Sequence, residues 1–269
     1  RARANWRRTP DIRDFPPLRI NFQTSQTDDT LFDKHDNVKL VTHCNSHDRY
    51  APAVVSEYLA YRIYNALTDY SFRVRLVDIT YVYTDRDKTA NSYAVFIEHK
   101  ERLGKRIGGD PVVTERVPVS SIYPQNLNLA SVFQYFIGNT DFSPIATPPD
   151  EDCCHNQALF TSEEGPYRTI PFDFDQTGLV DAKHAAPNPR FGIPTVKVRL
   201  YRGRCVNNEL LPETLQHFRD KRAEIEALIE NQPELTPTTQ RNLLKYVDSF
   251  YGVIDKPRRV NYRIVDACL

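Results

Sequence analysis

Apolar and polar positions alternate in several short stretches of the N-terminal half of the chain. Such alternation is typical of strands with one buried face, and it predicts strands over Leu18–Phe22, Val38–Thr42, Phe72–Tyr83 and Tyr93–Lys100. Between the second and third strands, apolar residues recur at helical spacing from Pro52 to Thr68, which predicts a helix that begins at the proline. This order favours a small antiparallel sheet with one helix across it.

After Gly104 the pattern changes to helical spacing. It predicts helices over Leu127–Ile137, about Pro212–Glu230 and Thr236–Val253. We therefore expect an α+β fold with an N-terminal lobe at residues 15–103 and a mostly helical C-terminal lobe at residues 104–269.

Composition narrows the class of protein. The 269 residues are 40% apolar and 26% charged, as in a globular protein of one large domain or two lobes that share a cleft. Thirty-five basic and 35 acidic residues give a formal net charge of zero, whereas nucleic-acid-binding proteins usually carry a basic excess. We therefore expect no nucleic-acid partner. We also expect no membrane span, since no stretch approaches the roughly 20 apolar residues that one requires. The chain begins at Arg1 and contains no methionine, which we interpret as a processed or trimmed piece.

The segment Ile170–Asp175 carries the most informative chemistry. Interpreted as a strand, it places Phe172 and Phe174 on one face and Asp173 and Asp175 on the other. Two carboxylates on one face repel each other unless a cation lies between them or one is protonated. Magnesium and manganese prefer such oxygen ligands. The alternative is an exposed strand edge followed by a polar turn.

Two further polar segments precede this one, Gly138–Asp141 and His155–Asn156. Each is ambiguous alone, because glycine and asparagine also suit the end of a helix. Their order, however, matches kinase-type phosphoryl transfer. In that chemistry one Asp accepts the proton of the attacking hydroxyl, while an Asn and a second Asp hold the divalent cations.

The chain resembles the spore-coat CotH-type proteins, a family with an atypical kinase fold. The resemblance spans about Phe15 to Cys205. It is carried most specifically by Gly138–Asp141, His155–Phe160 and Ile170–Asp175, and more loosely by Leu18–Phe22, Val38–Val41, Glu57–Asn65 and Tyr93–Glu98. It implies a bilobal protein-kinase-like fold that uses ATP with Mg²⁺ or Mn²⁺. It further implies Asp141 as the base and, as metal ligands, Asn156, Asp173 and Asp175.

Two features depart from the kinase pattern. No glycine precedes Gly104, so a glycine-rich loop over the phosphates is absent, and Gln23–Thr27 is a candidate replacement. Fourteen residues also lie between Asp141 and Asn156, where kinases have about four. The proline-rich insert Phe142–Cys154 is interpreted as an ordered surface loop that covers the site or holds a substrate.

Three charged residues of the N-terminal half are candidate nucleotide contacts. Phosphoryl transfer uses a strand Lys on the phosphates and a helix carboxylate to hold it, and Lys39 and Glu57 suit these roles. The alternative is an exposed Lys with a Glu that is favoured near a helix N-terminus. Glu98 follows the strand that would lead to a hinge beside the adenine, or it is simply a charged strand end.

A basic segment lies at Val196–Cys205. Arginine forks bind phosphate or carboxylate, but we favour an alternating segment that buries Val196, Val198 and Leu200 while its cations face water. The basic runs Arg1–Arg8 and Lys256–Arg259 are interpreted as solvated ends.

The five cysteines are too few for a small disulfide scaffold. Zinc is disfavoured because neither His43-Cys44 nor Cys153-Cys154-His155 has the usual ligand spacing. If Cys153 or Cys154 is bonded, we expect Cys44 or Cys205 as the partner rather than Cys268.

Two functions remain from different classes. The first is ATP- and metal-dependent phosphoryl transfer to a protein Ser or Thr or to a small hydroxyl acceptor, with adenylyl transfer as a variant. The second is a non-catalytic binding or coat-assembly protein on the same fold. Asp141, Asn156, Asp173 and Asp175 favour the first, and the missing glycine-rich loop favours the second.

Overall fold

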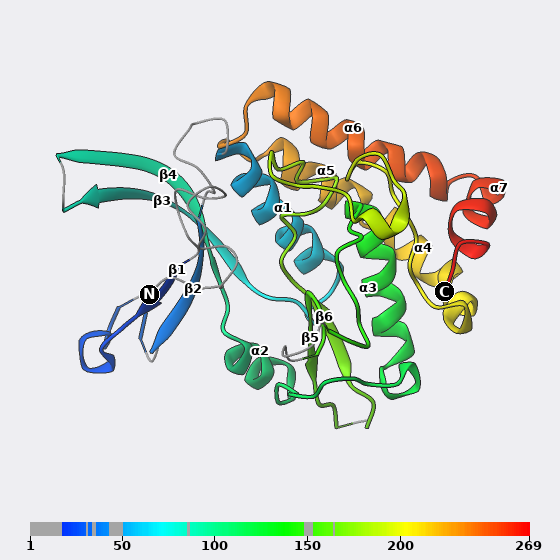
Figure 1. The fold of residues 1–269 in the computed structure, drawn as a ribbon, viewed down its shortest axis with the longest axis horizontal. Helices are drawn as coiled ribbons and strands as arrows, with labels where there is room; N and C mark the ends of the chain where they lie inside the picture. The colour runs from blue at the N-terminus through cyan, green and yellow to red at the C-terminus, as the bar shows by residue number, and fades with distance from the viewer. Residues whose placement is uncertain are drawn as a thin grey trace.

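A four-stranded antiparallel sheet forms one end of the molecule (Figure 1). The computed structural model describes residues 18–30, 32–33, 36–42, 51–84, 87–147, 153–163 and 165–269. The strands are β1 (Leu18–Asn21), β2 (Asn37–Thr42), β3 (Val74–Tyr83) and β4 (Lys88–Ile97). They are arranged in the order β1-β2-β4-β3. The predicted strands are thus confirmed, but β4 begins five residues before the predicted Tyr93, because polar residues 88–92 pair with Ile79–Tyr83.

Helix α1 (Ala51–Leu67) packs against β3 and β4 on one side and against α5 (Arg222–Glu230) on another. Its apolar side chains belong to one hydrophobic core that runs from Val95 and Ile97 of β4 to Phe133 and Phe136 of α3 (Pro124–Ile137). The sheet and the helical part of the chain therefore share a core. The expected division at residues 103 and 104 falls inside α2 (Lys100–Ile107), and the two-lobe description stays a prediction.

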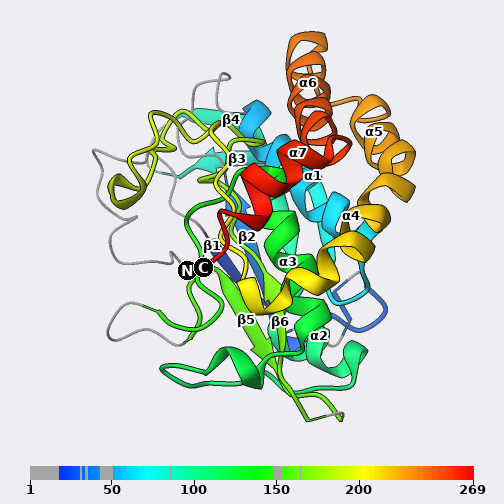
Figure 2. The ribbon, with the colours of Figure 1, turned by 90° about the vertical axis from the view of Figure 1, so that its right-hand side faces the viewer.

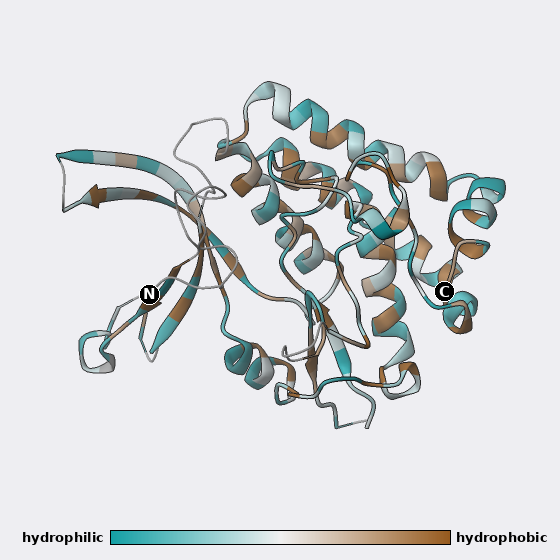
Figure 3. Cartoon of the chain, viewed as in Figure 1, coloured by the Kyte–Doolittle hydropathy of each residue, from teal (hydrophilic) through white to brown (hydrophobic). Residues whose placement is uncertain are grey.

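As expected, the chain after Gly104 is rich in helices, although its described residues between 138 and 204 hold only a short hairpin and one 3₁₀ turn. In the turned view, α5 and most of α4 (Leu211–Asp220) lie to the right of α3, and α6 (Pro237–Ile254) lies above it (Figure 2). The single helix predicted at about 212–230 is two helices, because the chain changes direction at Lys221. Hydrophilic and hydrophobic residues alternate along helix α6 (Figure 3). Its buried residues are Leu243, Val247, Phe250, Tyr251 and Ile254. Most of them recur three or four positions apart, which places them on one face of the helix.

Short elements complete the fold. Helix α7 (Pro257–Val260) and the π-helical turn η7 (Asn261–Val265) follow α6 and were not predicted. The 3₁₀ turns are η2 (Thr24–Gln26), η4 (Val119–Ser121), η5 (Pro189–Phe191) and η6 (Cys205–Leu210). Across the described residues, each helix is too short or too polar to cross a lipid bilayer.

A separate antiparallel hairpin consists of β5 (Gln157–Phe160) and β6 (Arg168–Pro171) and packs on α3. The strand expected over Ile170–Asp175 therefore ends at Pro171. Asp173 has a left-handed backbone, with φ 62°. Phe174 then enters the core between the rings of Tyr61 and Phe133, at centroid distances of 4.5 and 5.5 Å. The prediction that Asp173 and Asp175 share one strand face is wrong, because burial of Phe174 bends the chain.

Candidate functional site

The Asp141 turn is built by the end of α3. Gly138 has a left-handed backbone with φ 68°, and its N–H donates to the carbonyls of Gln134 and Tyr135. A Cβ at this position would lie 2.1 Å from the Tyr246 hydroxyl, so the turn requires glycine. Asn139 Oδ1 then accepts the N–H of Asp141 at 2.8 Å. The segment is thus a helix end, as the alternative interpretation held, and this helix end presents Asp141.

The Asp141 carboxylate is held by both residues of the second segment. His155 Nε2 lies 2.9 Å from Asp141 Oδ1. Asn156 Nδ2 donates to the Asp141 carbonyl at 2.6 Å and to Oδ2 at 3.2 Å. The Asp141 side chain nevertheless remains 35% exposed, so its carboxylate is accessible from solvent. Asn156 itself has a left-handed backbone, with φ 53°, a conformation that asparagine tolerates better than most residues.

The Asp173–Asp175 segment lies next to this pair. The Phe172 N–H donates to the Asn156 carbonyl at 3.1 Å, and the Asp173 N–H donates to the Tyr61 hydroxyl at 2.9 Å. Asp175 is buried, and its Oδ2 lies 3.0 Å from His184 Nε2. The chain then returns to the end of α3, where the Leu179 N–H donates to the Ile137 carbonyl at 2.9 Å. All three polar segments therefore converge at one place.

Lys39 and Glu57 reach the same place from the sheet and from α1. Lys39 Nζ lies 5.5 Å from the centroid of the Phe172 ring, a cation–π distance. Glu57 is buried one helical turn before Tyr61. Burial raises the pKa of the Tyr61 hydroxyl well above its usual range, and the carboxylates of Glu57, Asp173 and Asp175 raise it further. A direct contact between Lys39 and Glu57 stays a prediction.

Glu98 has structural partners. Its Oε2 lies 2.8 Å from Arg106 Nη2 and accepts the Arg73 N–H at 3.0 Å, while its own N–H donates to the Arg73 carbonyl. These contacts tie the end of β4 to β3 and to α2. Because the carboxylate and the N–H are both engaged, a nucleotide contact at Glu98 would use its carbonyl group. The proposed hinge role stays a prediction.

The donor atoms near Asp141 suit a hard divalent cation. No group of three or more His, Cys, Asp or Glu side chains capable of holding a metal occurs within the described ranges. A magnesium site does not require one, because Mg²⁺ is usually held by one or two carboxylates together with phosphate oxygens and water. Asn156 directs its amide N–H groups at Asp141, so its Oδ1 is the atom suited to a metal.

The basic segment does not form an alternating strand, and two of its cations do not face water. Arg202 Nη1 donates to the carbonyls of Thr140 and Phe142 at 2.9 and 2.6 Å. Arg199 donates to the carbonyls of Phe136 and Tyr246 at 3.0 and 2.7 Å. Burial, with the nearby cations Arg204 and Arg190, lowers the pKa of Arg202 to about 10, although Asp141 acts in the opposite direction. The expectation of solvated arginines is wrong at Arg199 and Arg202, because backbone carbonyls at the end of α3 and around Asp141 need donors.

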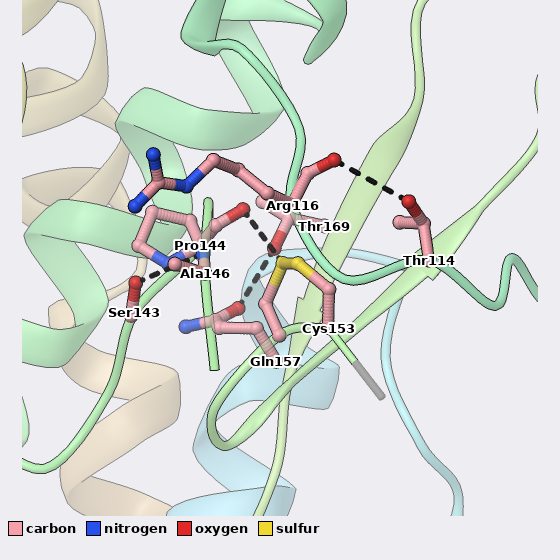
Figure 4. Close-up of a disulfide and its surroundings, with 9 residues drawn as sticks. Thr114, Arg116, Ser143, Pro144, Ala146, Cys153, Gln157 and Thr169 are labelled. Atoms are coloured by element: carbon pink, nitrogen blue, oxygen red, sulfur yellow. Dashed lines mark hydrogen bonds between the residues drawn. A yellow bond between two sulfur atoms is a disulfide. The ribbon is translucent and has the colours of Figure 1, made fainter. Parts of the chain in front are cut away.

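The cysteine pairs also differ from those expected. Cys153 bonds to its neighbour Cys154, as Figure 4 shows, and Cys205 bonds to Cys268. Cys44 lies outside the described residues. Phe142, Cys153 and Cys154 are buried, and the Ser143 N–H donates to the His155 carbonyl. The two ends of the Phe142–Cys154 insert are therefore part of the packed structure rather than a surface loop.

Four residues at this site were not assigned a role from the sequence: Tyr61, His155, His184 and Arg202. Tyr61 lies four positions after Glu57, which places both on one helix face, and this spacing could have indicated it. His155 adjoins Asn156 in sequence. No local signal points to Arg202, because its carbonyl partners lie 62 and 60 positions earlier. His184 lies only nine positions after Asp175, but the irregular chain between them gives no periodic spacing that would pair the two.

No protein-family model, curated protein or solved structure matches this chain. The resemblance to CotH-type proteins stays a prediction.

Proposed function

We propose that this protein is an ATP- and divalent-metal-dependent phosphotransferase with a bilobal kinase-like fold. Its acceptor would be a protein Ser or Thr or a small hydroxyl compound. One observation carries the proposal: hydrogen bonds join Asn156 to Asp141 and to Phe172, the residue next to Asp173, although these residues are separate in sequence. Kinase-type transfer requires a base, an Asn and an Asp in such proximity.

Each residue has a role in this proposal. Asp141 accepts the proton of the attacking hydroxyl, and His155 holds its carboxylate in one orientation. Asn156, Asp173 and Asp175 would hold Mg²⁺ or Mn²⁺, which when bound neutralises the charge of the nucleotide phosphates. Lys39 would contact the phosphates from the strand that precedes α1, and Glu57 would orient it from α1.

A second candidate is a binding or coat-assembly protein that does not transfer phosphate. It is favoured by the segment after β1, where the 3₁₀ turn Thr24–Gln26 stands in place of a glycine-rich loop. Side chains and a helical turn approach phosphates less closely than bare glycine backbone does. The phosphotransferase would turn over ATP, whereas the binding or assembly protein would not. The assembly protein would also bind no nucleotide if assembly does not require one.

Thermal unfolding with millimolar ATP, with and without Mg²⁺ or Mn²⁺, tests the proposal. A ligand that binds only the native state raises the midpoint, so we expect a rise with ATP and metal together that exceeds the rise with either alone. Mass spectrometry of an acceptor mixture after incubation then distinguishes phosphate from adenylate transfer. Absence of any metal-dependent shift would contradict the proposal, while binding without transfer would favour the second candidate.

A further inference from the structure

A cavity of about 530 Å³ lies between α3, α6 and the C-terminal turns, and none of its lining residues belongs to the Asp141 site. Three of its lining residues are arginines: Arg199 from the basic segment, Arg259 from α7 and Arg263 from η7. Tyr135 of α3, Ser249 of α6 and Tyr262 complete its polar lining. We call this the arginine pocket. The pocket includes residues of two basic segments, Val196–Cys205 and Lys256–Arg259, that have no role in the phosphotransfer proposal.

The charge of the arginine pocket is unbalanced. No Asp or Glu is among its lining residues, and none of the ion pairs within the described ranges involves the three arginines. Arg199 and Arg259 donate to backbone carbonyls instead, Arg259 to that of Gly252 at 2.9 Å. Carbonyl contacts orient a guanidinium but do not neutralise it. Three like charges around one cavity repel one another.

Arg199 and Tyr135 are held in fixed positions in the lining of the arginine pocket. Arg199 is tied to both α3 and α6 through Phe136 and Tyr246, and its guanidinium stacks 3.8 Å from the centroid of the Tyr246 ring. Tyr135 is buried beside it, with its ring edge against Phe250 and Tyr201. Burial raises the pKa of Tyr135, whereas Arg199 and Arg263 act in the opposite direction. Arg199, Arg263 and Tyr135 all line this one cavity.

We propose that the arginine pocket binds a phosphate group, either free or as a phosphate monoester. Arginine presents paired N–H donors that match the oxygens of phosphate, and the hydroxyl of Tyr135 supplies a further donor. A bound dianion relieves the mutual repulsion of the three cations. The site is independent of the phosphotransfer proposal, because it shares no residue with the Asp141 site.

Calorimetric titration of the protein with inorganic phosphate at constant ionic strength tests this proposal. We expect saturable binding that weakens by about fivefold or more in Arg259→Gln and in Arg263→Gln, since each removes one charge-assisted contact. Arg258→Gln is the matched control, because it removes the same charge from α7 but does not line the cavity. It should change the affinity by less than about twofold. Arg199→Gln is avoided, since its loss also removes contacts that join α3 to α6.

Two results would overturn the proposal. One is no saturable heat with wild-type protein at millimolar phosphate. The other is equal loss of affinity in Arg258→Gln and Arg263→Gln, which would show diffuse attraction to a basic surface rather than a pocket. Circular dichroism of each variant checks that the fold is retained.

A second titration distinguishes a phosphorylated protein from free phosphate as the ligand of the pocket. A short phosphoserine peptide is compared with inorganic phosphate and with the same peptide carrying serine. Tighter binding of the phosphopeptide, lost in Arg263→Gln, assigns the pocket to a phosphorylated protein. Equal affinity assigns it to free phosphate or a small phosphate ester. Binding of the serine peptide with equal affinity would contradict a phosphate site.

Discussion

The Asp141 carboxylate is held from two sides and is still accessible, the arrangement that a general base requires. We expect Asp141→Asn to retain nucleotide binding and to lower turnover by about 10²-fold or more, the usual cost of losing a general base. Phosphate release or transfer in steady state measures this. Asp181→Asn is the control, because Asp181 is an exposed carboxylate that pairs with Lys197. Near-wild-type turnover of Asp141→Asn would show that Asp141 is only the end of a helix.

Arg202 positions the turn that carries Asp141 through two carbonyl contacts. We expect Arg202→Gln to lower the free energy of unfolding by about 2 kcal/mol, since two buried carbonyls lose a charged donor. Arg190→Gln removes an equal charge from an exposed neighbour of Arg202 and should change it by less than about 0.5 kcal/mol. Urea denaturation compares the two. Equal stability of both variants would contradict a holding role for Arg202.

Helix α1 connects the sheet to the candidate site through one hydroxyl. Tyr61→Phe removes the acceptor of the Asp173 N–H and should lower the free energy of unfolding by about 1 kcal/mol, because a partly buried donor loses its partner. Tyr64→Phe on the same helix is the matched control. The Tyr64 hydroxyl is buried and has no hydrogen-bond partner among the residues described, so its removal should be neutral or stabilising. Chemical denaturation that ranks the two variants in the opposite order would contradict this account.

Most elements were predictable from local pattern. The strands β1 to β4 and the helices α1, α3 and α6 follow from alternation and helical spacing. Two of the failures had different causes, one non-local and one local. The predicted strand through Asp173 was wrong because Phe174 packs between Tyr61 and Phe133, residues more than 40 positions away. Helix α2 was missed because it is short and polar, and its ends are fixed by His99 and Gly108.

The same distinction applies to the candidate site. The residue types at Asp141, Asn156 and Asp173 could be selected from the sequence, because their order suggests a chemistry. The residues that hold them in place could not be predicted from the sequence. Arg202 reaches the Asp141 turn from 60 residues away and Tyr61 reaches Asp173 from 112 residues away. Such contacts depend on the packed fold rather than on local propensity.

One disulfide joins Cys205 to Cys268, near the C-terminal end of the chain. Cys205–Cys268 spans 63 positions, whereas Cys153–Cys154 spans one. A cross-link restricts the unfolded chain according to the loop that it closes, by about 4 kcal/mol for a loop of this length. We therefore expect Cys205→Ala/Cys268→Ala to destabilise the protein by about 2–4 kcal/mol. Cys153→Ala/Cys154→Ala should cost much less through this effect. Urea denaturation without reductant in which the adjacent pair costs as much would contradict the estimate.

The central claim is that the converging carboxylates bind a metal–nucleotide complex. Isothermal titration of ATP with and without Mg²⁺, in the wild type and in Asp175→Asn, tests it most directly. We expect saturable, Mg²⁺-dependent binding in the wild type and in the control Asp78→Asn, whose carboxylate is exposed on β3. The nearly isosteric Asp175→Asn should keep its circular dichroism spectrum and lose that binding. An unchanged affinity for Mg²⁺–ATP in Asp175→Asn, or no binding to the wild type, would contradict the claim.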